Sequence, residues 1–282
     1  MSEVAVHETN NTHLTGNNAP VYEEVTAADL EVIGEIPTDI NGNFLRVGPN
    51  PYYVPDPDRY HIFDGDGMLH GVHLSNGTAT YRNRFIQSKA LQEERAKGEW
   101  IYPGLNMFCD YIAKGEMSPV KNSGSTAMVF HNNQLFAMME GGTPYRISLP
   151  ELDTEGEHDF DGTLTHAFTA HPKVDAQSGE MMTFGYGITP PFLTYSVVDK
   201  GGRAVHTTEV TIPKPIMMHD CAITKNYTIF PDLPLTFDFE KMMAGGGFVN
   251  WDAGNGCRIG ILPRGGDDTS IRWFDIEESF LF

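Results

Sequence analysis

The chain has little cysteine and few basic residues for its length. Its three cysteines, Cys109, Cys221 and Cys257, are widely spaced among 282 residues and form no CxxC pair. This spacing excludes a disulfide framework and a zinc knuckle, and it favours a reduced cytoplasmic setting. Only 19 residues are Lys or Arg against 38 Asp or Glu, which gives a formal net charge of −19. Because such a charge repels phosphate backbones, we expect no nucleic-acid partner.

The sequence also lacks a secretory signal and any apolar run long enough to span a membrane. Residues 1–20 are polar and slightly acidic, which predicts a disordered leader. The chain is 40% hydrophobic, enough to bury a large core, and we assign residues 21–282 to one incomplete domain.

Long helices are lacking as well. Helical periodicity is confined to residues 88–100 and 235–245. Elsewhere, short apolar or alternating runs are separated by Gly, Pro, Asn and Asp, and they predict hairpins at residues 127–140 and around residues 199–202. This pattern favours an all-β sandwich, barrel or propeller. The 29 glycines and the length favour a propeller, whose blades take roughly 40 to 50 residues each.

Geometry argues against several of the eleven histidines as metal ligands. His70 and His73 have the spacing of a metal pair, but strand residues three apart point to opposite faces. The same objection applies to His166 paired with His171. Two more histidines lie in the leader, and His131 is expected in a hairpin turn.

His171 in AHPKVD and His219 in MMHDCA remain as candidates. Each follows an extended apolar stretch and precedes a turn, where a propeller strand would reach the central axis. Each is either a metal ligand or a polar residue of the core. Imidazole ligands suit zinc, copper, iron and nickel, and open positions on iron(II) suit oxygen activation.

Two acidic features have both a structural and a functional interpretation. Glu140 ends the apolar run LFAMME, so it is either a solvated strand end or a carboxylate that accepts the N–H of a metal-bound histidine. FDGDGML at residues 63–69 suggests a calcium loop, but it lacks the full ligand series. We therefore expect a tight hairpin built on Asp-Gly there.

Six stretches resemble successive motifs of the carotenoid cleavage oxygenases, a family of carotenoid, apocarotenoid and lignostilbene dioxygenases. They are GNFLRVGPNP at 42–51, HIFDGDGMLHGV at 61–72, YRNRFIQS at 81–88, LFAMMEGGTPYRI at 135–147, AHPKVDAQSGEM at 170–181 and MMHDCAITKNYTIF at 217–230. Each motif is weak alone, but together they follow the family's order and cover nearly all of the chain after the leader.

The resemblance implies an all-β fold, a seven-bladed β-propeller capped by a dome of loops, of which this chain covers roughly the first half to two-thirds. Residues 21–282 would then be an incomplete β-propeller oxygenase domain. It also implies a non-haem iron(II), Fe(2+), on the propeller axis, held by four histidines. Carried over residue by residue, His171 resembles the first ligand and His219 the second. Glu140 resembles a glutamate that orients ligating histidines.

The implied activity is that of a dioxygenase, an oxidoreductase that adds O2 across a conjugated carbon–carbon double bond and breaks it to give two carbonyl products. The alkene supplies the electrons, and the sequence has neither a P-loop nor a GxGxxG after a strand. The implied partners are O2 and an apolar polyene or stilbene. This substrate would bind in an apolar tunnel and be taken up through peripheral contact with a membrane.

The substrate class depends on two positions. Stilbene-cleaving members are expected to carry a lysine beside the orienting glutamate, where this chain has Met139, and this favours a carotenoid or apocarotenoid. Lys121 could hold a phenol from another strand, so a stilbene stays open. A non-enzymatic β-propeller binding module and a metal-dependent hydrolase or lactonase with calcium or zinc also stay open.

The chain closes on the apolar run WFDIEESFLF without a turn or polar tail. Since domains rarely stop inside a buried strand, we expect a longer parent protein. The resemblance places a third histidine ligand shortly after Phe282 and the fourth much later. We therefore expect these 282 residues alone to hold iron weakly and to be inactive.

Overall fold

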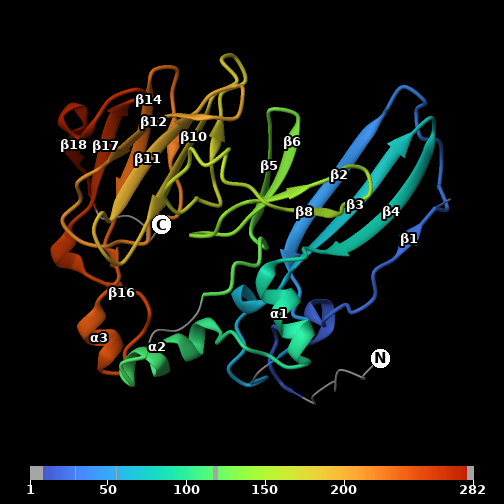
Figure 1. The fold of residues 1–282 in the computed structure, drawn as a ribbon, viewed down its shortest axis with the longest axis horizontal. Coiled ribbons are helices and arrows are strands. Elements are labelled where there is room, and N and C mark those ends of the chain that lie inside the picture. The colour runs from blue at the N-terminus through green and yellow to red at the C-terminus, as the bar shows by residue number, and fades with distance from the viewer. Residues whose placement is uncertain (1–8, 29, 55, 117–119, 278–282) are drawn as a thin grey trace.

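The protein is described by a computed structural model that covers the chain except residues 1–8, 29, 55, 117–119 and 278–282. In the described part, strands form four four-stranded antiparallel sheets and one two-stranded sheet. Figure 1 shows the sheets following one another in chain order, from β1–β4 at one end of the molecule to β13–β18 at the other. A four-stranded unit is thus repeated along the chain, as the sequence predicts for a propeller.

The first two sheets are formed by residues 26–157. The first has the strand order β1-β4-β3-β2 and consists of β1 (Thr26–Ala27), β2 (Gly42–Pro49), β3 (Gly67–Ser75) and β4 (Thr78–Phe85). The second has the order β5-β6-β7-β8 and consists of β5 (Ala127–His131), β6 (Gln134–Met138), β7 (Tyr145–Ile147) and β8 (Thr154–Glu157).

The remaining strands follow the same scheme. The third sheet has the order β12-β11-β10-β9 and consists of β9 (Lys173–Val174), β10 (Met181–Tyr186), β11 (Leu193–Val198) and β12 (Ala204–Glu209). The fourth has the order β13-β14-β17-β18 and consists of β13 (Ala222–Ile223), β14 (Tyr227–Asp232), β17 (Arg258–Pro263) and β18 (Arg272–Asp275). The small sheet pairs β15 (Leu235–Thr236) with β16 (Asn250–Trp251).

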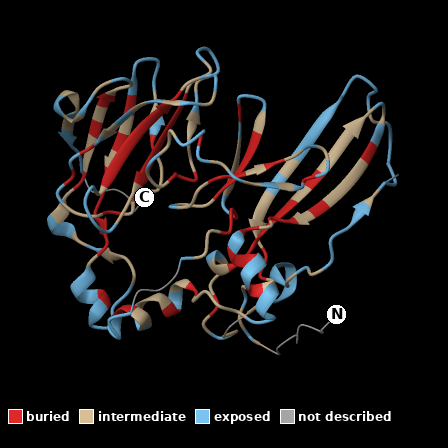
Figure 2. Ribbon diagram, in the orientation of Figure 1, coloured by how far each residue is buried: buried red, intermediate tan, exposed pale blue. Residues whose placement is uncertain are grey.

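The core lies between neighbouring sheets rather than in one central cluster. The first and second sheets share a cluster that includes Leu69 and Tyr145. Met138 of the second sheet packs in one cluster with Met181 of the third. A larger cluster, including Phe230, joins the third sheet to the fourth. Figure 2 shows the corresponding buried stretches along the strands. Each sheet therefore buries its apolar faces against its neighbours, which is how blades of a propeller are stabilised.

Both predicted hairpins are confirmed. Strands β11 and β12 flank the turn at residues 199–202. Strands β5 and β6 pair through a turn at Asn132 and Asn133, whose φ angles are 49° and 57°. The placement of His131 in the turn was wrong, because it is the last residue of β5 and only 3% exposed. Asparagine tolerates the left-handed conformation, so the two asparagines make the turn and leave the histidine on the strand.

The helices are short. Helix α1 (Lys89–Lys97) and helix α3 (Phe239–Met243) lie within the predicted stretches 88–100 and 235–245. Helix α2 (Leu105–Ala113) was not predicted, so the expectation of only two helical stretches was wrong. Its N-cap is Gly104, which supplies no side-chain hydrogen bond, so the usual start signal is missing. Helices α2 and α3 pack together through Ile112 and Met242, beside the third and fourth sheets.

The expectation of a hairpin at FDGDGML was also wrong. Ile62–Asp64 form a 3-10 turn, η2, and β3 begins at Gly67. Asp66 is fully buried and forms an ion pair with Lys121 (2.7 Å), which also pairs with Glu94 of α1 (2.8 Å). The acidic stretch therefore serves a buried salt-bridge network that ties β3 to α1. Other short 3-10 turns are η1 (Gly16–Asn18), η3 (Ala253–Asn255) and η4 (Asp268–Ser270).

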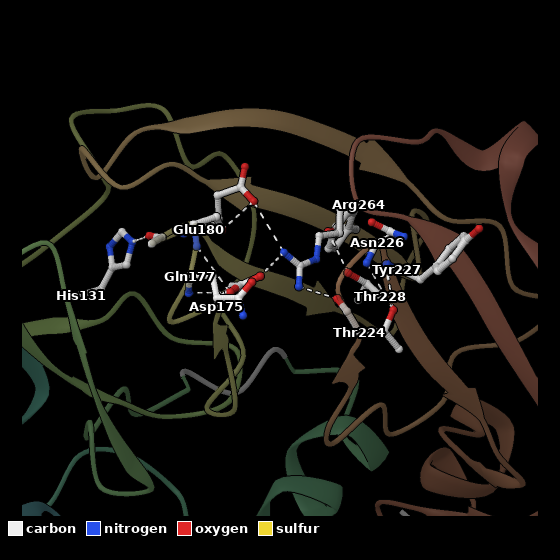
Figure 3. A network of polar contacts seen from close by, with 12 residues as sticks. His131, Asp175, Gln177, Glu180, Thr224, Asn226, Tyr227, Thr228 and Arg264 are labelled. Carbon is white, nitrogen blue, oxygen red and sulfur yellow. Dashed lines mark hydrogen bonds and ion pairs between the residues drawn. The ribbon is translucent and has the colours of Figure 1, made fainter.

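Polar contacts hold the turn between β9 and β10 from both sides (Figure 3). Nε2 of His131, on the second sheet, donates to the carbonyl of Gly179 at 2.9 Å. From the fourth sheet, Nη1 of Arg264 lies 2.5 Å from Oδ2 of Asp175 and 3.7 Å from Oε2 of Glu180. The third sheet is thus fixed to both neighbours by hydrogen bonds as well as by apolar packing.

The two ends of the chain are only partly described. Within the predicted leader, Asn11 donates to the carbonyls of Pro57 and Tyr60 at 2.8 Å each, and Leu14 is only 8% exposed. In the C-terminal run, strand β18 covers Arg272–Asp275, and the last five residues lie outside the described residues. Within the described part of the chain, every helix is too short or too polar to cross a membrane.

Candidate metal centre

His171 and His219, the two candidate ligands, lie side by side. Their ring centroids are 4.5 Å apart, with the planes at 64°. His171 precedes β9 of the third sheet, and His219 lies between the bridge residue Ile216 and β13 of the fourth sheet. Both therefore sit in short connecting segments at the start of a sheet, rather than on strands. The fold brings together the same two histidines that the sequence motifs select.

The imidazole of His171 has a buried nitrogen atom that is suited to binding a metal. Its Nε2 atom is buried and has no hydrogen-bond partner among the described residues. Burial, helped by the neighbouring His219, holds the pKa of His171 below its ordinary value, so the ring is neutral at physiological pH. A neutral imidazole with a buried lone pair is the form that binds transition metals.

Glu140 faces His219. It lies two residues beyond the end of β6 in the second sheet, and its Oε1 atom contacts Nδ1 of His219. This hydrogen bond and the negative charge of Glu140 raise the pKa of His219, although burial acts in the opposite direction. An imidazole that donates Nδ1–H to a carboxylate presents Nε2 to a metal, and its orientation is fixed by the same contact.

The second carboxylate oxygen of Glu140 is also engaged. The hydroxyl of Tyr186, the last residue of β10, donates to Oε2. Burial and the charge of Glu140 hold the pKa of Tyr186 far above its ordinary value, so this hydroxyl keeps its proton. Sequence analysis did not single out Tyr186, and its only local signal is a polar aromatic residue at the end of a buried strand.

These side chains fit a metal. Ligand atoms of Glu140, His171 and His219 all lie within 4.8 Å of one another, and no other such group of three occurs in the described part of the chain. Because both oxygens of Glu140 contact donors, the imidazoles are the available ligands and the carboxylate is better placed to orient His219. A site rich in imidazole suits iron, zinc, copper or nickel.

The residues next to His219 are held by apolar packing and by an ion pair. Met218 and Cys221 are buried in the cluster between the third and fourth sheets. Met217 joins the cluster of α2 and α3. Asp220 pairs with Lys173 at 2.6 Å. The segment is therefore anchored on both sides of the histidine.

The rejected histidines have other partners. His70 and His73 are both on β3, where His70 contacts the hydroxyl of Tyr81 at 2.8 Å and His73 contacts Asn43. His166 is not on a strand as assumed, but its Nε2 lies 2.7 Å from Oγ of Ser196, away from the His171 site. None of these three belongs to the candidate metal group.

Comparison with known proteins gives a consistent picture. Residues 18–282 match the family described as retinal pigment epithelial membrane protein, RPE65. Carotenoid 9,10(9',10')-cleavage dioxygenase of Crocus sativus is 42% identical to the chain, over 96% of the chain and 53% of that protein. Isoeugenol monooxygenase of Pseudomonas putida is 34% identical, over 99% of the chain and 59% of that protein.

A solved structure is similar as well. The crystal structure of Pseudomonas brassicacearum lignostilbene dioxygenase matches with a TM-score of 0.85 and 32% identity, over 96% of this chain and 57% of that one. The chain thus spans about half the length of the curated relatives it matches. Its structural neighbours are carotenoid oxygenases, which have a seven-bladed propeller, so the predicted all-β propeller is confirmed and the described sheets are its blades. With the match over residues 18–282, these similarities show that the chain belongs to the RPE65/carotenoid cleavage oxygenase family.

Proposed function

We propose that the full-length protein containing this chain is a non-haem iron(II) dioxygenase that cleaves a conjugated double bond of a carotenoid or apocarotenoid. The observation that carries this proposal is the meeting of His171 and His219 beside Glu140, from three successive sheets. Membership of a family with carotenoid cleavage dioxygenases supports the reaction class.

In this proposal each side chain has a distinct task. His171 and His219 hold the metal through their imidazoles, and the buried Nε2 of His171 is the atom that lacks any other partner among the described residues. Glu140 holds the Nδ1 proton of His219 and thereby fixes which nitrogen faces the metal. When bound, iron(II) with open coordination positions would supply oxygen activation.

The overall reaction is balanced without a further reductant. One molecule of O2 adds across the double bond, the carbon–carbon bond breaks, and each carbon keeps one oxygen atom as a carbonyl. The substrate alkene supplies the electrons, so a nicotinamide or flavin is not required. The apolar surroundings of the site, which include Met217 and the α2–α3 cluster, suit a hydrocarbon substrate.

A polyene is favoured over a phenolic stilbene by the contacts of Lys121. Its side chain is 10% exposed and pairs with both Asp66 and Glu94. Burial alone would lower the pKa of Lys121, but the two carboxylates outweigh this and raise it. Because its charge is already balanced by these carboxylates, Lys121 is poorly placed to hold a phenol. Met139, beside Glu140, offers only a thioether, which accepts from Ser123 N at 3.4 Å.

A stilbene or a related phenolic alkene is the second candidate substrate. It is favoured by the similarity to isoeugenol monooxygenase and to lignostilbene dioxygenase. Both candidates share the same metal site and differ only in what the substrate pocket recognises. We further propose a cytoplasmic location and uptake of the apolar substrate by peripheral contact with a membrane. One relative is named as chloroplastic, so the location is to be tested by fractionation.

The test uses the full-length protein, purified without oxygen and loaded with iron(II). We expect about one iron per chain, as a single imidazole-rich site would hold. We also expect O2-dependent cleavage of a carotenoid or apocarotenal to two carbonyl products. A hydroxystilbene assayed in parallel separates the two substrate classes.

Substitutions identify the site. His171→Ala and His219→Ala should each abolish iron retention and cleavage. His70→Ala is the matched control, because His70 is also partly buried but bonds to Tyr81 on the first sheet. Full iron content and activity in either site variant would contradict the assignment, as would a wild-type protein that binds no iron.

A further inference from the structure

We propose that Tyr186 is a positioning residue of the metal site, which fixes the carboxylate of Glu140 and, through it, the imidazole of His219. This inference rests on the proposed function. It concerns a residue that is not itself one of the candidate ligands. Its role follows from how it is held and from what its hydroxyl touches.

The ring of Tyr186 is held rigidly. Tyr186 ends β10, where it pairs with Leu193 on β11. Its ring stacks on Phe237, with centroids 6.1 Å apart and an interplanar angle of 18°. It also packs against the cluster of Ile112 and Met242 from α2 and α3. A strand end and a helix pair thus fix the direction in which the hydroxyl points.

The hydroxyl continues a series of hydrogen bonds to the histidine. Tyr186 donates to Oε2 of Glu140, and Oε1 of the same carboxylate contacts Nδ1 of His219. The terminal torsion of a glutamate is intrinsically broad, so one contact alone leaves the carboxylate free to rotate. Two contacts, one on each oxygen, define its plane.

His219 needs this external support more than a residue on a strand would. It lies in the segment between Ile216 and β13, outside the strands of the fourth sheet. Its ring contacts the carboxylate of Glu140, and a hydrogen bond to a carboxylate is charge-assisted. The hydrogen-bond partners of metal-ligating histidines set the orientation and basicity of the ring. A carboxylate that is free to rotate should therefore weaken metal binding.

The simpler explanation is that Tyr186 is a partly buried tyrosine whose hydroxyl has found an acceptor, as buried tyrosines usually do. Tyr195, on the neighbouring strand β11, provides the matched comparison. It is fully buried, and its hydroxyl lies 2.9 Å from Oγ1 of Thr228. Both hydroxyls are hydrogen-bonded, but Tyr195 bonds to Thr228 and Tyr186 to Glu140.

The experiment compares Tyr186→Phe with Tyr195→Phe in the full-length protein. Each change keeps the ring and removes one buried hydroxyl. Iron(II) affinity is measured without oxygen, by competition with a chelator of known affinity. We expect Tyr186→Phe to weaken iron binding about threefold to tenfold, less than the roughly 10–100-fold cost of removing a direct partner of a ligand. Tyr195→Phe should leave the affinity unchanged, and thermal unfolding reports any general loss of stability.

A double-mutant cycle with Glu140→Gln decides whether Tyr186 acts through Glu140. If it does, Tyr186→Phe should cause little further loss of affinity in the Glu140→Gln protein. The inference would be wrong if Tyr186→Phe kept wild-type iron affinity, or if it lowered the affinity equally in the wild-type and Glu140→Gln proteins. Either result would leave the proposed function intact. A wild-type protein that binds no iron would instead overturn the proposed function, and this inference with it.

Discussion

The surroundings of His171 and His219 shift the pKa values of the two imidazoles in opposite directions, although the ring centroids are only 4.5 Å apart. Burial lowers the pKa of His171, whereas the hydrogen bond that His219 donates to Glu140 raises the pKa of His219. A metal binds an imidazole nitrogen that carries no proton. Burial therefore keeps His171 neutral, and Glu140 keeps the proton of a neutral His219 on Nδ1, which leaves Nε2 for a metal.

Glu140→Gln tests this division of tasks. The amide oxygen of glutamine can still accept Nδ1–H from His219, but without the charge that strengthens the bond. We expect the fold to be retained and iron affinity to fall by about 10–100-fold. The measurement is iron(II) competition titration of the full-length protein.

Glu155→Gln is the control for that experiment. Glu155 forms an exposed ion pair with Arg146 on the same sheet and does not belong to the candidate metal group. Unchanged iron affinity in Glu140→Gln would show that the charge of Glu140 does not support the metal through His219.

Sequence motifs selected His171, His219 and Glu140, and the structure brings these three together. Each of these residues lies in a stretch that resembles a family motif, and their roles at a metal stay predictions. Tyr186 was missed because its contact with Glu140 joins the third sheet to the second and has no local signature. His131 was misplaced because the two asparagines after it take the turn.

At the scale of elements, a buried charge network joins parts of the chain that are distant in sequence. Lys121 pairs with Asp66 at the start of β3 and with Glu94 of α1, and both carboxylates are almost fully buried. The segment after Lys121 is tied to the Glu140 turn, because Nδ2 of Asn122 donates to the carbonyl of Thr143 at 2.9 Å. This network supports the side of the site that carries Glu140.

Lys121→Ala should be strongly destabilising. It leaves two buried carboxylates without a cation, and breaking a buried ion pair in this way costs about 3–5 kcal/mol. Urea unfolding of the full-length protein, followed by circular dichroism, measures the change as a lower midpoint. Adding Asp66→Asn and Glu94→Gln to Lys121→Ala removes the unpaired charges and should recover part of the loss.

Lys89→Ala is the matched control for Lys121→Ala. Lys89 pairs with Glu157, but its side chain is 74% exposed. Exposed pairs contribute about 1 kcal/mol or less, so the midpoint should hardly change. Equal effects of the two substitutions would contradict the buried-network interpretation.

Elements with local signals were predicted well. Helix α1 has a capping serine, Ser88, and an ending glycine, Gly98, in the left-handed conformation. Hairpin β11–β12 has a Gly-rich turn. Helix α2 lacks a capping side chain at its start, although Gly115, with φ of 74°, follows its end. It also packs against α3. FDGDGML was misjudged because Asp66 turns inward to Lys121, a contact that depends on a residue far along the chain.

At the scale of the whole molecule, the site is assembled from successive blades. Glu140 belongs to the second sheet, His171 and Tyr186 to the third, and His219 to the fourth. Hydrogen bonds from His131 and Arg264 fix the third sheet between its neighbours (Figure 3). The spacing of the ligands therefore depends on the packing of blades, not on any one loop.

Because the site depends on blade packing, we predict that residues 1–282 made alone will hold iron far more weakly than the full-length protein. The chain spans 53% of the length of its Crocus sativus relative and supplies two of the four histidines that the family resemblance implies. Two imidazoles and an orienting carboxylate cannot hold iron(II) as tightly as a complete ligand set. No cleavage of a polyene is expected.

The same preparation should also self-associate. Phe44 on β2 and Phe274 on β18 are 64% and 51% exposed, and both lie on edge strands, of the first and fourth sheets respectively. Exposed apolar side chains on open sheet edges favour pairing between chains. Light scattering coupled to size exclusion, with iron quantification of each peak, tests both expectations, and the full-length protein is the control. An incomplete ligand set should lose the metal during separation. A monomeric preparation of residues 1–282 that retains about one iron per chain would therefore contradict both expectations and show that these blades build the site unaided.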